Sequence, residues 1–253
     1  MPRLLSRLPL VFAVLAACCA GPARAAELTV SAAASLTNAL REIAPLFEAE
    51  HPGTRLQLNF GASGALLQQI AKGAPADVLA SADQETMDRA QQQGLVAAAR
   101  RRNFASNALV VVVPAGAAVV PRVLGDLAQP AYARIAIGLP VSVPVGRYTK
   151  AALEAAGLWT AIEPRMVGAH NVRQALDYVA RAEVEAGFVY ATDAALMPGT
   201  VKLAFTVPTT QPLRYPAAPL NGAPNPAGAQ RFVDFLLAPK AQAVLARHGF
   251  GRP

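Results

Sequence analysis

Cysteine is nearly absent from this sequence, which has only two cysteines in 253 residues. Both, Cys18 and Cys19, lie in an apolar stretch near the N-terminus, so a chain cleaved after Ala25 has no thiol and no disulfide. Histidine is also scarce, with three residues, and no close-spaced group of His, Cys or carboxylate side chains occurs. The sequence therefore excludes a disulfide-stabilised fold and offers no site for a metal cation.

The sequence contains only one long hydrophobic run. Residues 8–20 are apolar, follow two arginines and precede the small-residue sequence Ala23-Arg24-Ala25. This order predicts a secretory signal peptide over residues 1–25. The run is about half of the ~20 residues that a transmembrane helix needs, so we expect a soluble, periplasmic mature protein. As an alternative, Leu15-Ala16-Ala17-Cys18 is similar to a lipoprotein cleavage site, which would leave a lipid on Cys18.

Charge of either sign is in short supply, with 23 Lys and Arg against 16 Asp and Glu. Removal of residues 1–25 takes away three arginines and no acid, which leaves 20 basic and 16 acidic residues and a net charge of +4. A surplus of this size helps to attract an anion. The basic residues are scattered apart from Arg100-Arg101-Arg102, which we expect at a solvated helix end, so no nucleic-acid partner is expected.

What the sequence does contain is a repeated alternation of short apolar strands and helical stretches. Strands are predicted at 28–30, 56–60 and 77–80, and helices follow them at 35–50, 63–72 and 83–93. The first helix places apolar residues on one face, and Pro45 is expected to kink or shorten it. Strand followed by helix, repeated, indicates an α/β fold with a doubly wound, mostly parallel sheet and flanking helices.

A second series of strands and helices begins after Asn107. Its strands are predicted at 108–113, 135–137, 187–190 and 201–207, and its helices at 145–156 and 171–182. The Pro-rich stretch 208–226 then returns the chain to its first part. We therefore expect two lobes with a cleft between them. Lobe 1 is discontinuous and comprises residues 26–106 and 208–253, whereas lobe 2 is inserted and comprises residues 107–207.

The strand-to-helix turns share a composition that favours anion binding. In open α/β sheets the ligand crevice lies at the carboxyl ends of the strands. A helix start leaves its first N–H groups without partners and carries a partial positive charge, so several starts aimed at one point bind an anion without lysine or arginine. Five such turns are small and neutral: Ala32-Ala33-Ala34-Ser35, Gly61-Ala62-Ser63-Gly64, Val143-Pro144-Val145-Gly146, His170-Asn171-Val172 and Val189-Tyr190-Ala191-Thr192.

Each candidate donor in these turns also has an ordinary structural interpretation. Ser35, Ser63 and Tyr190 offer hydroxyl groups, and Val145 and Val172 offer backbone N–H groups. A serine at a helix start is commonly a plain N-cap, and a tyrosine after a buried strand commonly packs in the core with its hydroxyl on the backbone. An apolar residue in a first helical turn is ordinary packing. The residues taken singly leave both interpretations open.

Several spaced motifs together resemble the family of periplasmic molybdate-binding proteins, over nearly the whole chain from about Leu28 to Phe250. The motifs are Thr29-Val30-Ser31-Ala32-Ala33-Ala34-Ser35-Leu36-Thr37-Asn38-Ala39, Gly73-Ala74-Pro75-Ala76-Asp77-Val78, Ser81-Ala82-Asp83-Gln84, Val143-Pro144-Val145-Gly146-Arg147-Tyr148, Asn171-Val172-Arg173-Gln174-Ala175-Leu176 and Gly187-Phe188-Val189-Tyr190. The resemblance implies a two-lobed periplasmic binding protein fold.

The resemblance also implies which residues hold the ligand. In that family two serines, two backbone N–H groups and a tyrosine hydroxyl hold the anion, and by motif these fall on Ser35, Ser63, Val145, Val172 and Tyr190. The oxyanion is bound through these donors, with no direct ligand to the metal and no cofactor. The sequence departs from the family pattern at three positions: Ala62 replaces a common serine, Val145 replaces an alanine and His170 replaces an acidic residue.

The function that the resemblance implies is capture of molybdate, and also of tungstate, outside the inner membrane and delivery to the permease of an ABC transporter. We expect a monomer that is not an enzyme. Other two-lobed binders, for sulfate, an organic acid or ferric ion, stay as alternatives. An exported serine hydrolase with Ser63 as nucleophile is the enzymatic alternative, although Gly61-Ala62-Ser63-Gly64 lacks the last glycine of the nucleophile elbow and no turn places a base beside it except His170.

Overall fold

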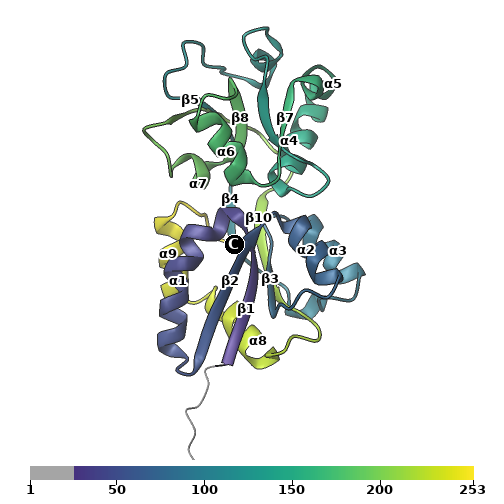
Figure 1. Ribbon diagram of the computed structural model, residues 1–253, viewed down its shortest axis with the longest axis vertical. Helices are drawn as coiled ribbons and strands as arrows, with labels where there is room; N and C mark the ends of the chain where they lie inside the picture. The colour runs from purple at the N-terminus through teal and green to yellow at the C-terminus, as the bar shows by residue number, and fades with distance from the viewer. Residues whose placement is uncertain (1–25) are drawn as a thin grey trace, which may run out of the picture.

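The computed structural model describes residues 26–253 and consists of two α/β lobes, one above the other in Figure 1. Each lobe contains one five-stranded sheet with helices packed around it. The predicted fold class, a two-lobed α/β architecture, is confirmed. The predicted signal peptide, including Cys18 and Cys19, lies outside the described residues. Between residues 26 and 253, no helix has the length and apolar character needed to cross a membrane.

The sheet of the lower lobe in Figure 1 has the strand order β2-β1-β3-β10-β4. β1 pairs in parallel with β2 and β3, and β10 pairs antiparallel with β3 and β4, so only β10 runs against the others. The strands are β1 (Ala26–Ala33), β2 (Thr54–Gly61), β3 (Val78–Ala80), β4 (Arg102–Asn107) and β10 (Leu213–Pro219). The helical elements are the 3-10 turns η2 (Ala34–Leu36) and η3 (Ala98–Arg100) and the helices α1 (Thr37–Glu50), α2 (Ser63–Ala71), α3 (Gln84–Gln92), α8 (Pro226–Phe235) and α9 (Pro239–Arg247).

The upper sheet repeats this design with the order β7-β6-β8-β5-β9. β6 pairs in parallel with β7 and β8, and β5 pairs antiparallel with β8 and β9. The strands are β5 (Leu109–Pro114), β6 (Ile135–Gly138), β7 (Met166–Ala169), β8 (Ala186–Tyr190) and β9 (Val201–Thr206). The helical elements are α4 (Pro144–Ala155), α5 (Trp159–Ile162), α6 (Val172–Ala180), α7 (Ala191–Ala194) and the 3-10 turns η4 (Leu124–Ala128) and η5 (Glu163–Arg165).

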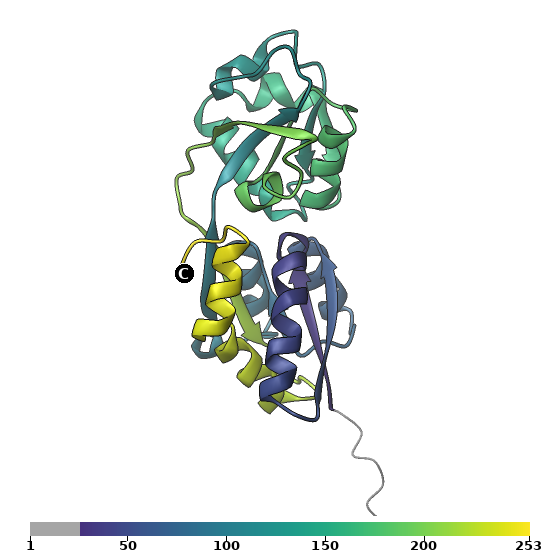
Figure 2. The ribbon, with the colours of Figure 1, turned by 90° about the vertical axis from the view of Figure 1, so that its left-hand side faces the viewer.

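The chain passes between the sheets at two places. β4 ends at Asn107 and β5 begins at Leu109, whereas β9 ends at Thr206 and β10 begins at Leu213. Figure 2 shows both passages on the same side of the molecule. In each sheet the reversed strand is the one that the chain forms directly after a passage. The passages leave the opposite side of the gap between the lobes without a covalent connection.

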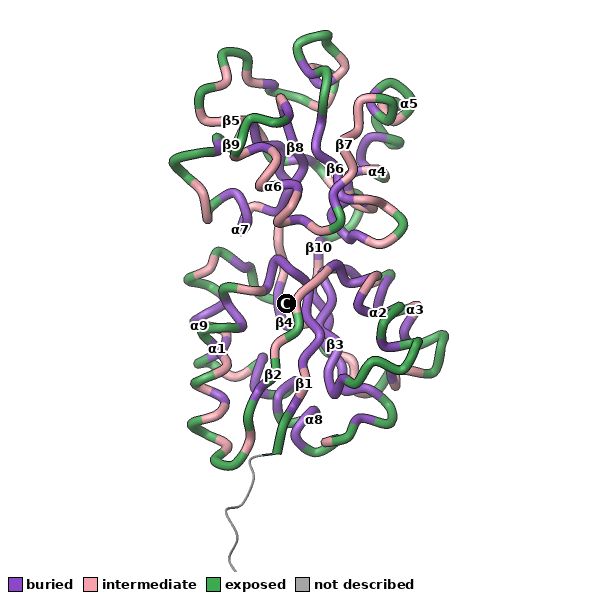
Figure 3. Tube along the Cα trace, viewed as in Figure 1, coloured by how far each residue is buried: buried purple, intermediate pink, exposed green. Residues whose placement is uncertain are grey.

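Packing follows the apolar pattern of the sequence. On α1 the buried residues are Ala39, Leu40, Ile43 and Phe47, the face that the periodicity predicts. The central residues of β5, at 109–113, are all no more than 1% exposed, as expected for a strand covered on both faces. Figure 3 shows buried chain through both sheets and along the facing ends of the two lobes. These facing ends are where the strand-to-helix turns lie.

Pro45 neither ends nor shortens α1, which continues through it to Glu50. Proline removes one helical N–H donor and leaves a carbonyl one turn earlier without its partner. Pro45 is exposed, so water reaches that side of the helix and can satisfy the carbonyl. The expectation of a shortened helix was therefore wrong.

Strand β10 was not predicted, because its sequence contains Pro216 and Pro219 within the stretch assigned as a return segment. Prolines are rare in central strands, since they cannot donate to the ladder. Here the pairing with β4 shifts register between Tyr215 and Pro216, and a bulge tolerates a missing donor. β4 and β7 were also missed. The arginine run is a helix end only at Arg100, because β4 begins at Arg102.

Candidate functional site

A small cavity lies between the facing ends of the two lobes, and all five residues predicted from the sequence line it. The space inside it is small, close to the minimum that admits one water molecule, and is too little for a sugar or an amino acid. The lining residues are Ala33, Ala34, Ser35, Gly61, Ala62, Ser63, Ala82, Val143, Pro144, Val145, Asn171, Val172 and Tyr190. The ligand-binding roles of the five stay a prediction, but their positions meet the geometric condition for a shared site.

The cavity is buried and its lining is uncharged. The exposed fractions are 0% for Ser63, 2% for Ser35, 1% for Val145 and Tyr190, and 4% for Val172. No Asp, Glu, Lys, Arg or His is among the residues that line it in the described part of the chain. Hydrogen-bond donors in such a low-dielectric space interact with an anion far more strongly than they do in water.

Three helices begin at the cavity: α2 at Ser63, α4 at Pro144 and α6 at Val172. In α6 the side chain of Asn171 caps the helix by accepting from the N–H groups of Arg173 and Gln174, which leaves the N–H of Val172 for the cavity. In α4 the first residue is proline, so Val145 supplies the first N–H. The starts of these helices give the cavity a positive potential without a charged side chain.

The two serines are not N-caps of their helices. The N-cap positions before Ser35 and Ser63 are Ala33 and Ala62, and neither helix start has a side-chain cap. Instead, the Ser63 Oγ accepts from the N–H of Ala82 at 3.0 Å, so its own hydrogen is available to the cavity. The plain-cap interpretation of the serines is therefore wrong.

Tyr190 ends β8 with its side chain in the cavity. Its hydroxyl is buried and makes no hydrogen bond to any residue of the described chain. Burial, with smaller contributions from Tyr215 and other neighbours, raises the pKa of Tyr190 well above its usual value, so the hydroxyl stays protonated and remains a donor. The interpretation in which this hydroxyl is tied to backbone is wrong. An unpaired buried donor carries a free-energy cost that an acceptor in the cavity would remove.

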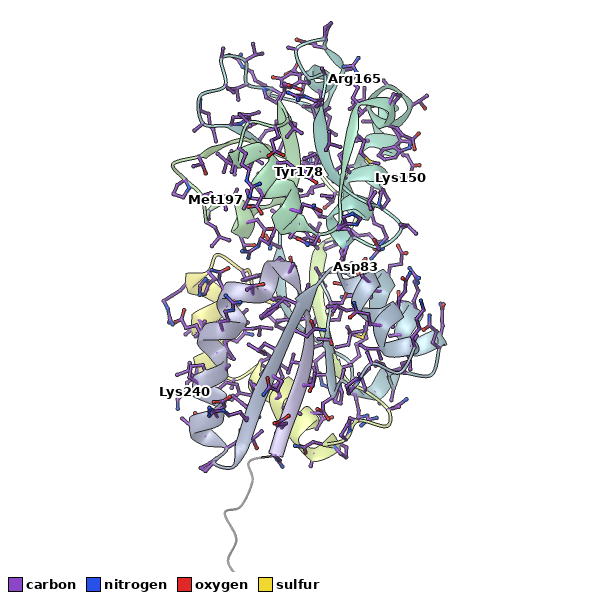
Figure 4. The ribbon with its side chains drawn as sticks, viewed as in Figure 1. Asp83, Lys150, Arg165, Tyr178, Met197 and Lys240 are labelled. Carbon is purple, nitrogen blue, oxygen red and sulfur yellow. The ribbon has the colours of Figure 1, made fainter. Side chains whose placement is uncertain are left out.

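Arg147, two residues after Val145, joins the lobes at one edge of the cavity. Its guanidinium contacts the Asp83 carboxylate, with Nη2 2.6 Å and Nε 2.8 Å from Oδ2, and donates to the Thr86 hydroxyl at 2.8 Å. Asp83 is itself the N-cap of α3, and Figure 4 places it at the end of the lower lobe that faces the upper one. This charge pair therefore links α4 to the opposite lobe.

Arg173, the residue after Val172, makes a second link. Its Nη2 donates to the Ser35 carbonyl at 3.0 Å and its Nη1 to the Asn38 Oδ1 at 2.9 Å, while its Nε lies 2.6 Å from the Asp193 Oδ1. Burial raises the pKa of Asp193 to about 6, against the lowering effect of Arg173. Sequence reasoning missed both arginines, although each stands one or two residues after a predicted donor in a motif.

The lobes also meet through backbone. The N–H of Gly64 in α2 donates to the Ser142 carbonyl at 3.0 Å, next to the start of α4. A Cβ at Gly64 would lie 2.7 Å from that oxygen and 3.0 Å from the Ser142 Cα, so only glycine allows this approach. With these contacts in place, donors from both lobes reach one cavity, as expected of a closed form.

Histidines and metal ligands are not part of this arrangement. His170 is exposed and does not line the cavity, and His51 and His248 lie at the C-terminal ends of α1 and α9. Residues 26–253 contain no group of three or more His, Cys, Asp or Glu side chains positioned to hold a metal ion. The cavity offers several hydrogen-bond donors and no carboxylate among its lining residues in the described chain, which suits a ligand whose surface atoms accept hydrogen bonds.

Comparison with known proteins gives consistent matches over most of the chain. Residues 28–251 match a family described as bacterial extracellular solute-binding protein. The chain is 38% identical to the molybdate-binding protein ModA of Escherichia coli (strain K12), over 94% of this chain and 95% of that one. It is 32% identical to ModA of Haemophilus influenzae, over 90% and 91% of the two chains. The solved structure of the Azotobacter vinelandii periplasmic molybdate-binding protein superposes with a TM-score of 0.76 at 26% identity and covers 89% of this chain and 99% of that one.

Proposed function

The chain belongs to the family of bacterial extracellular solute-binding proteins, and from this premise we propose that it captures molybdate outside the inner membrane and delivers it to the permease of an ABC transporter. Support comes from the molybdate-binding relatives, which align over nearly their full length. The observation that carries the proposal is the buried cavity that uncharged donor residues from both lobes line together. We propose that Ser35, Ser63, Val145, Val172 and Tyr190 bind the anion.

The donor set favours an anion that carries no proton. Molybdate, tungstate and sulfate have four oxygens that only accept hydrogen bonds, whereas phosphate near neutral pH keeps a hydroxyl that needs an acceptor. None of the lining side chains is a carboxylate, and the Ser63 oxygen already accepts from Ala82. A phosphate hydroxyl would therefore find no carboxylate to accept from it and would have to use the oxygen of a hydroxyl group that also donates to the anion. A poorly paired buried hydroxyl costs about 1–3 kcal/mol.

Size separates the remaining anions. Sulfate is smaller than molybdate, so in a cleft held to one width by the Gly64–Ser142 contact its hydrogen bonds would be stretched. Tungstate is nearly the same size as molybdate, and we propose that the protein binds both.

Capture proceeds by closure of the two lobes about the passages at Asn107 and at 207–212. The open protein exposes the donors to water, and the anion brings them together because no lobe alone supplies the full set. Neutral donors also permit release, since opening leaves no buried countercharge without a partner. Arg147 and Arg173 lie outside the lining and stabilise the closed lobes rather than the anion.

We propose the division into lobe 1 (26–106 and 208–253) and lobe 2 (107–207), and a monomer that acts by binding rather than catalysis. The serine hydrolase alternative lacks support, because no histidine lines the cavity beside Ser63 in the described chain. Export through the signal peptide at 1–25, with lipid attachment at Cys18 as the alternative, places the protein in the periplasm or at its membrane surface.

Titration calorimetry of the mature protein with molybdate, tungstate, sulfate and phosphate tests this proposal. We expect tight binding of molybdate and tungstate and no measurable heat from the other two. Binding of sulfate in preference to molybdate would transfer the assignment to sulfate. Binding of phosphate as tight as that of molybdate would overturn the argument from the lack of a carboxylate acceptor. Absence of binding by all four anions would remove the function altogether.

A further inference from the structure

Tyr215, in the strand that the sequence did not predict, contacts two of the proposed ligand residues, Ser35 and Tyr190, from outside the cavity. It is fully buried in β10, and its ring packs edge-on against Tyr190, Phe104 and Phe250. Its hydroxyl oxygen lies 3.1 Å from the Ser35 Oγ and 3.2 Å from the Asn107 Nδ2, although Tyr215 does not itself line the cavity. A chain of polar groups therefore runs from the passage between the sheets to Ser35.

The orientation of Asn107 is set by its neighbours. The N–H of Ala108 can only donate, so the Asn107 Oδ1, 2.9 Å away, accepts from it. The amide NH₂ then faces the Thr192 hydroxyl at 2.9 Å and the Tyr215 hydroxyl at 3.2 Å, and it can only donate to both. The Tyr215 oxygen is thus an acceptor from Asn107.

The direction of the hydrogen bond between Tyr215 and Ser35 is determined when an acceptor is in the cavity. A hydroxyl has one hydrogen. If Tyr215 donates its hydrogen to the Ser35 oxygen, the Ser35 hydrogen is free to donate to an anion, and every group in the chain has a partner. The reverse arrangement turns the Ser35 hydrogen away from the anion and leaves the Tyr215 hydrogen without an acceptor. Burial raises the pKa of Tyr215 well above its usual value, which keeps that hydrogen in place.

We propose that Tyr215, oriented by Asn107, is a positioning residue that fixes Ser35 as a donor toward the bound oxyanion. By occupying one of the two acceptor sites of the serine oxygen, Tyr215 also disfavours anions that carry a proton. The inference rests on the proposed function and adds the reason for its selectivity. Ser63 is oriented in the same way, because its oxygen accepts from the Ala82 N–H and its hydrogen is left for the cavity. In this arrangement the Ser35 oxygen accepts from Tyr215, as the Ser63 oxygen accepts from Ala82.

The relay also connects the ligand site to the junction of the lobes. Asn107 is the last residue of β4, Thr192 lies in α7 of the upper lobe and Tyr215 in β10 of the lower one. Asn107 therefore donates to both lobes at the passage between them. The hydrogen bonds that orient Ser35 as a donor are therefore formed in the closed arrangement of the two lobes.

A double-mutant cycle read by titration calorimetry tests the proposal. Tyr215→Phe should weaken molybdate binding about tenfold, the effect of one hydrogen bond to a charged site, and should narrow the ratio of molybdate to phosphate affinity. In a Ser35→Ala background the same substitution should have almost no further effect, because the group that Tyr215 positions is gone. In a Ser63→Ala background it should keep its full effect.

Matched controls separate positioning from damage to the fold. Tyr132→Phe makes the same change at another fully buried tyrosine, away from the cavity, and should leave affinity unchanged. Asn107→Ala removes the upstream donor and keeps the Tyr215 hydroxyl, so it should also couple to Ser35 and not to Ser63, even if Tyr215→Phe unfolds. Equal effects of Tyr215→Phe in both serine backgrounds, or an unchanged molybdate to phosphate ratio, would overturn the relay. Failure of the wild-type protein to bind molybdate would instead overturn the proposed function.

Discussion

Lobe 1 lines the cavity with the two serines of the proposed site, whereas lobe 2 lines it with the two valines, proposed as backbone N–H donors, and with one tyrosine. The sheets behind these groups have the same strand order and the same single reversed strand. The difference lies in the residues beside each donor. In lobe 2, Arg147 and Arg173 stand next to the backbone donors and reach across to the other lobe. In the proposed site, lobe 1 contributes side-chain hydroxyls, and lobe 2 contributes backbone N–H groups, the Tyr190 hydroxyl and the arginines that contact the other lobe.

Lobe 2 contains a buried carboxylate, Asp193, that pairs with Arg173 of the same lobe. Asp193 is 0% exposed and has Arg173 as its cation, so Arg173→Gln leaves a buried carboxylate without a partner. We expect the free energy of unfolding at pH 7.5 to fall by about 3–5 kcal/mol. Urea unfolding measures this free energy. Arg181→Gln is the control, because Arg181 is exposed and, within residues 26–253, pairs only with Glu183. Equal stability of the two variants would contradict a structural role for the buried pair.

The same pair predicts a pH dependence in lobe 2. The pKa of Asp193 is raised to about 6, so between pH about 4 and 6 the folded protein holds a proton that the unfolded chain has lost. Its contribution to stability is complete below pH about 4 and is lost as the pH rises through 6, on the order of 3 kcal/mol in total. Asp193→Asn should remove this dependence. Parallel stability profiles of the two proteins from pH 4 to 7 would show that Asp193 does not titrate there.

The contact between Gly64 of one lobe and Ser142 of the other has no room for an added carbon atom. Gly64→Ala places a Cβ 2.7 Å from the Ser142 carbonyl in the closed form only. Overpacking of this kind costs about 1–3 kcal/mol, so molybdate affinity should fall by up to about 150-fold with little change in the stability of the ligand-free protein. Calorimetry gives the affinity, and small-angle scattering should show a smaller compaction on ligand addition than in the wild type. Wild-type compaction with wild-type affinity would mean that the lobes close differently.

The division of labour between the lobes is tested by deleting side chains on both sides. Ser35→Ala, Ser63→Ala and Tyr190→Phe each remove a hydroxyl donor and should weaken molybdate binding by about 1–3 kcal/mol. Val145→Ala and Val172→Ala keep the backbone N–H and should change the binding free energy by less than about 0.5 kcal/mol. Calorimetry on the five variants compares them directly. Equal losses of molybdate affinity at the valines and the serines would contradict the distinction between backbone donors and side-chain donors.

The candidate site could be predicted from the sequence because its donors lie in local strand-to-helix turns. A serine or valine at a helix start is visible in about ten residues of sequence, and the order of the motifs brings the turns to one edge of each sheet. The contacts of Arg147 with Asp83 and of Arg173 with Asn38 could not be predicted in this way. They join residues 64 and 135 positions apart and exist only in one relative placement of the lobes.

Tyr215 was missed for a different reason. Its strand carries two prolines, and local propensity argues against a central strand at such a place. The bulge at Pro216 removes the conflict, but a bulge is decided by the neighbouring strand and not by the local sequence. Asn107 was recognised only as part of a passage between lobes, because its hydrogen bonds reach residues 85 and 108 positions away.

The central claim is that uncharged donors from both lobes jointly surround one doubly negative anion. An anomalous difference map from crystals grown with molybdate, measured at the molybdenum absorption edge, locates that anion directly. We predict one strong peak in the cavity, with anion oxygens within hydrogen-bonding distance of the Ser35, Ser63 and Tyr190 hydroxyls and of the Val145 and Val172 N–H groups. A peak held by Arg147, Arg173 or another charged side chain outside the cavity would contradict it.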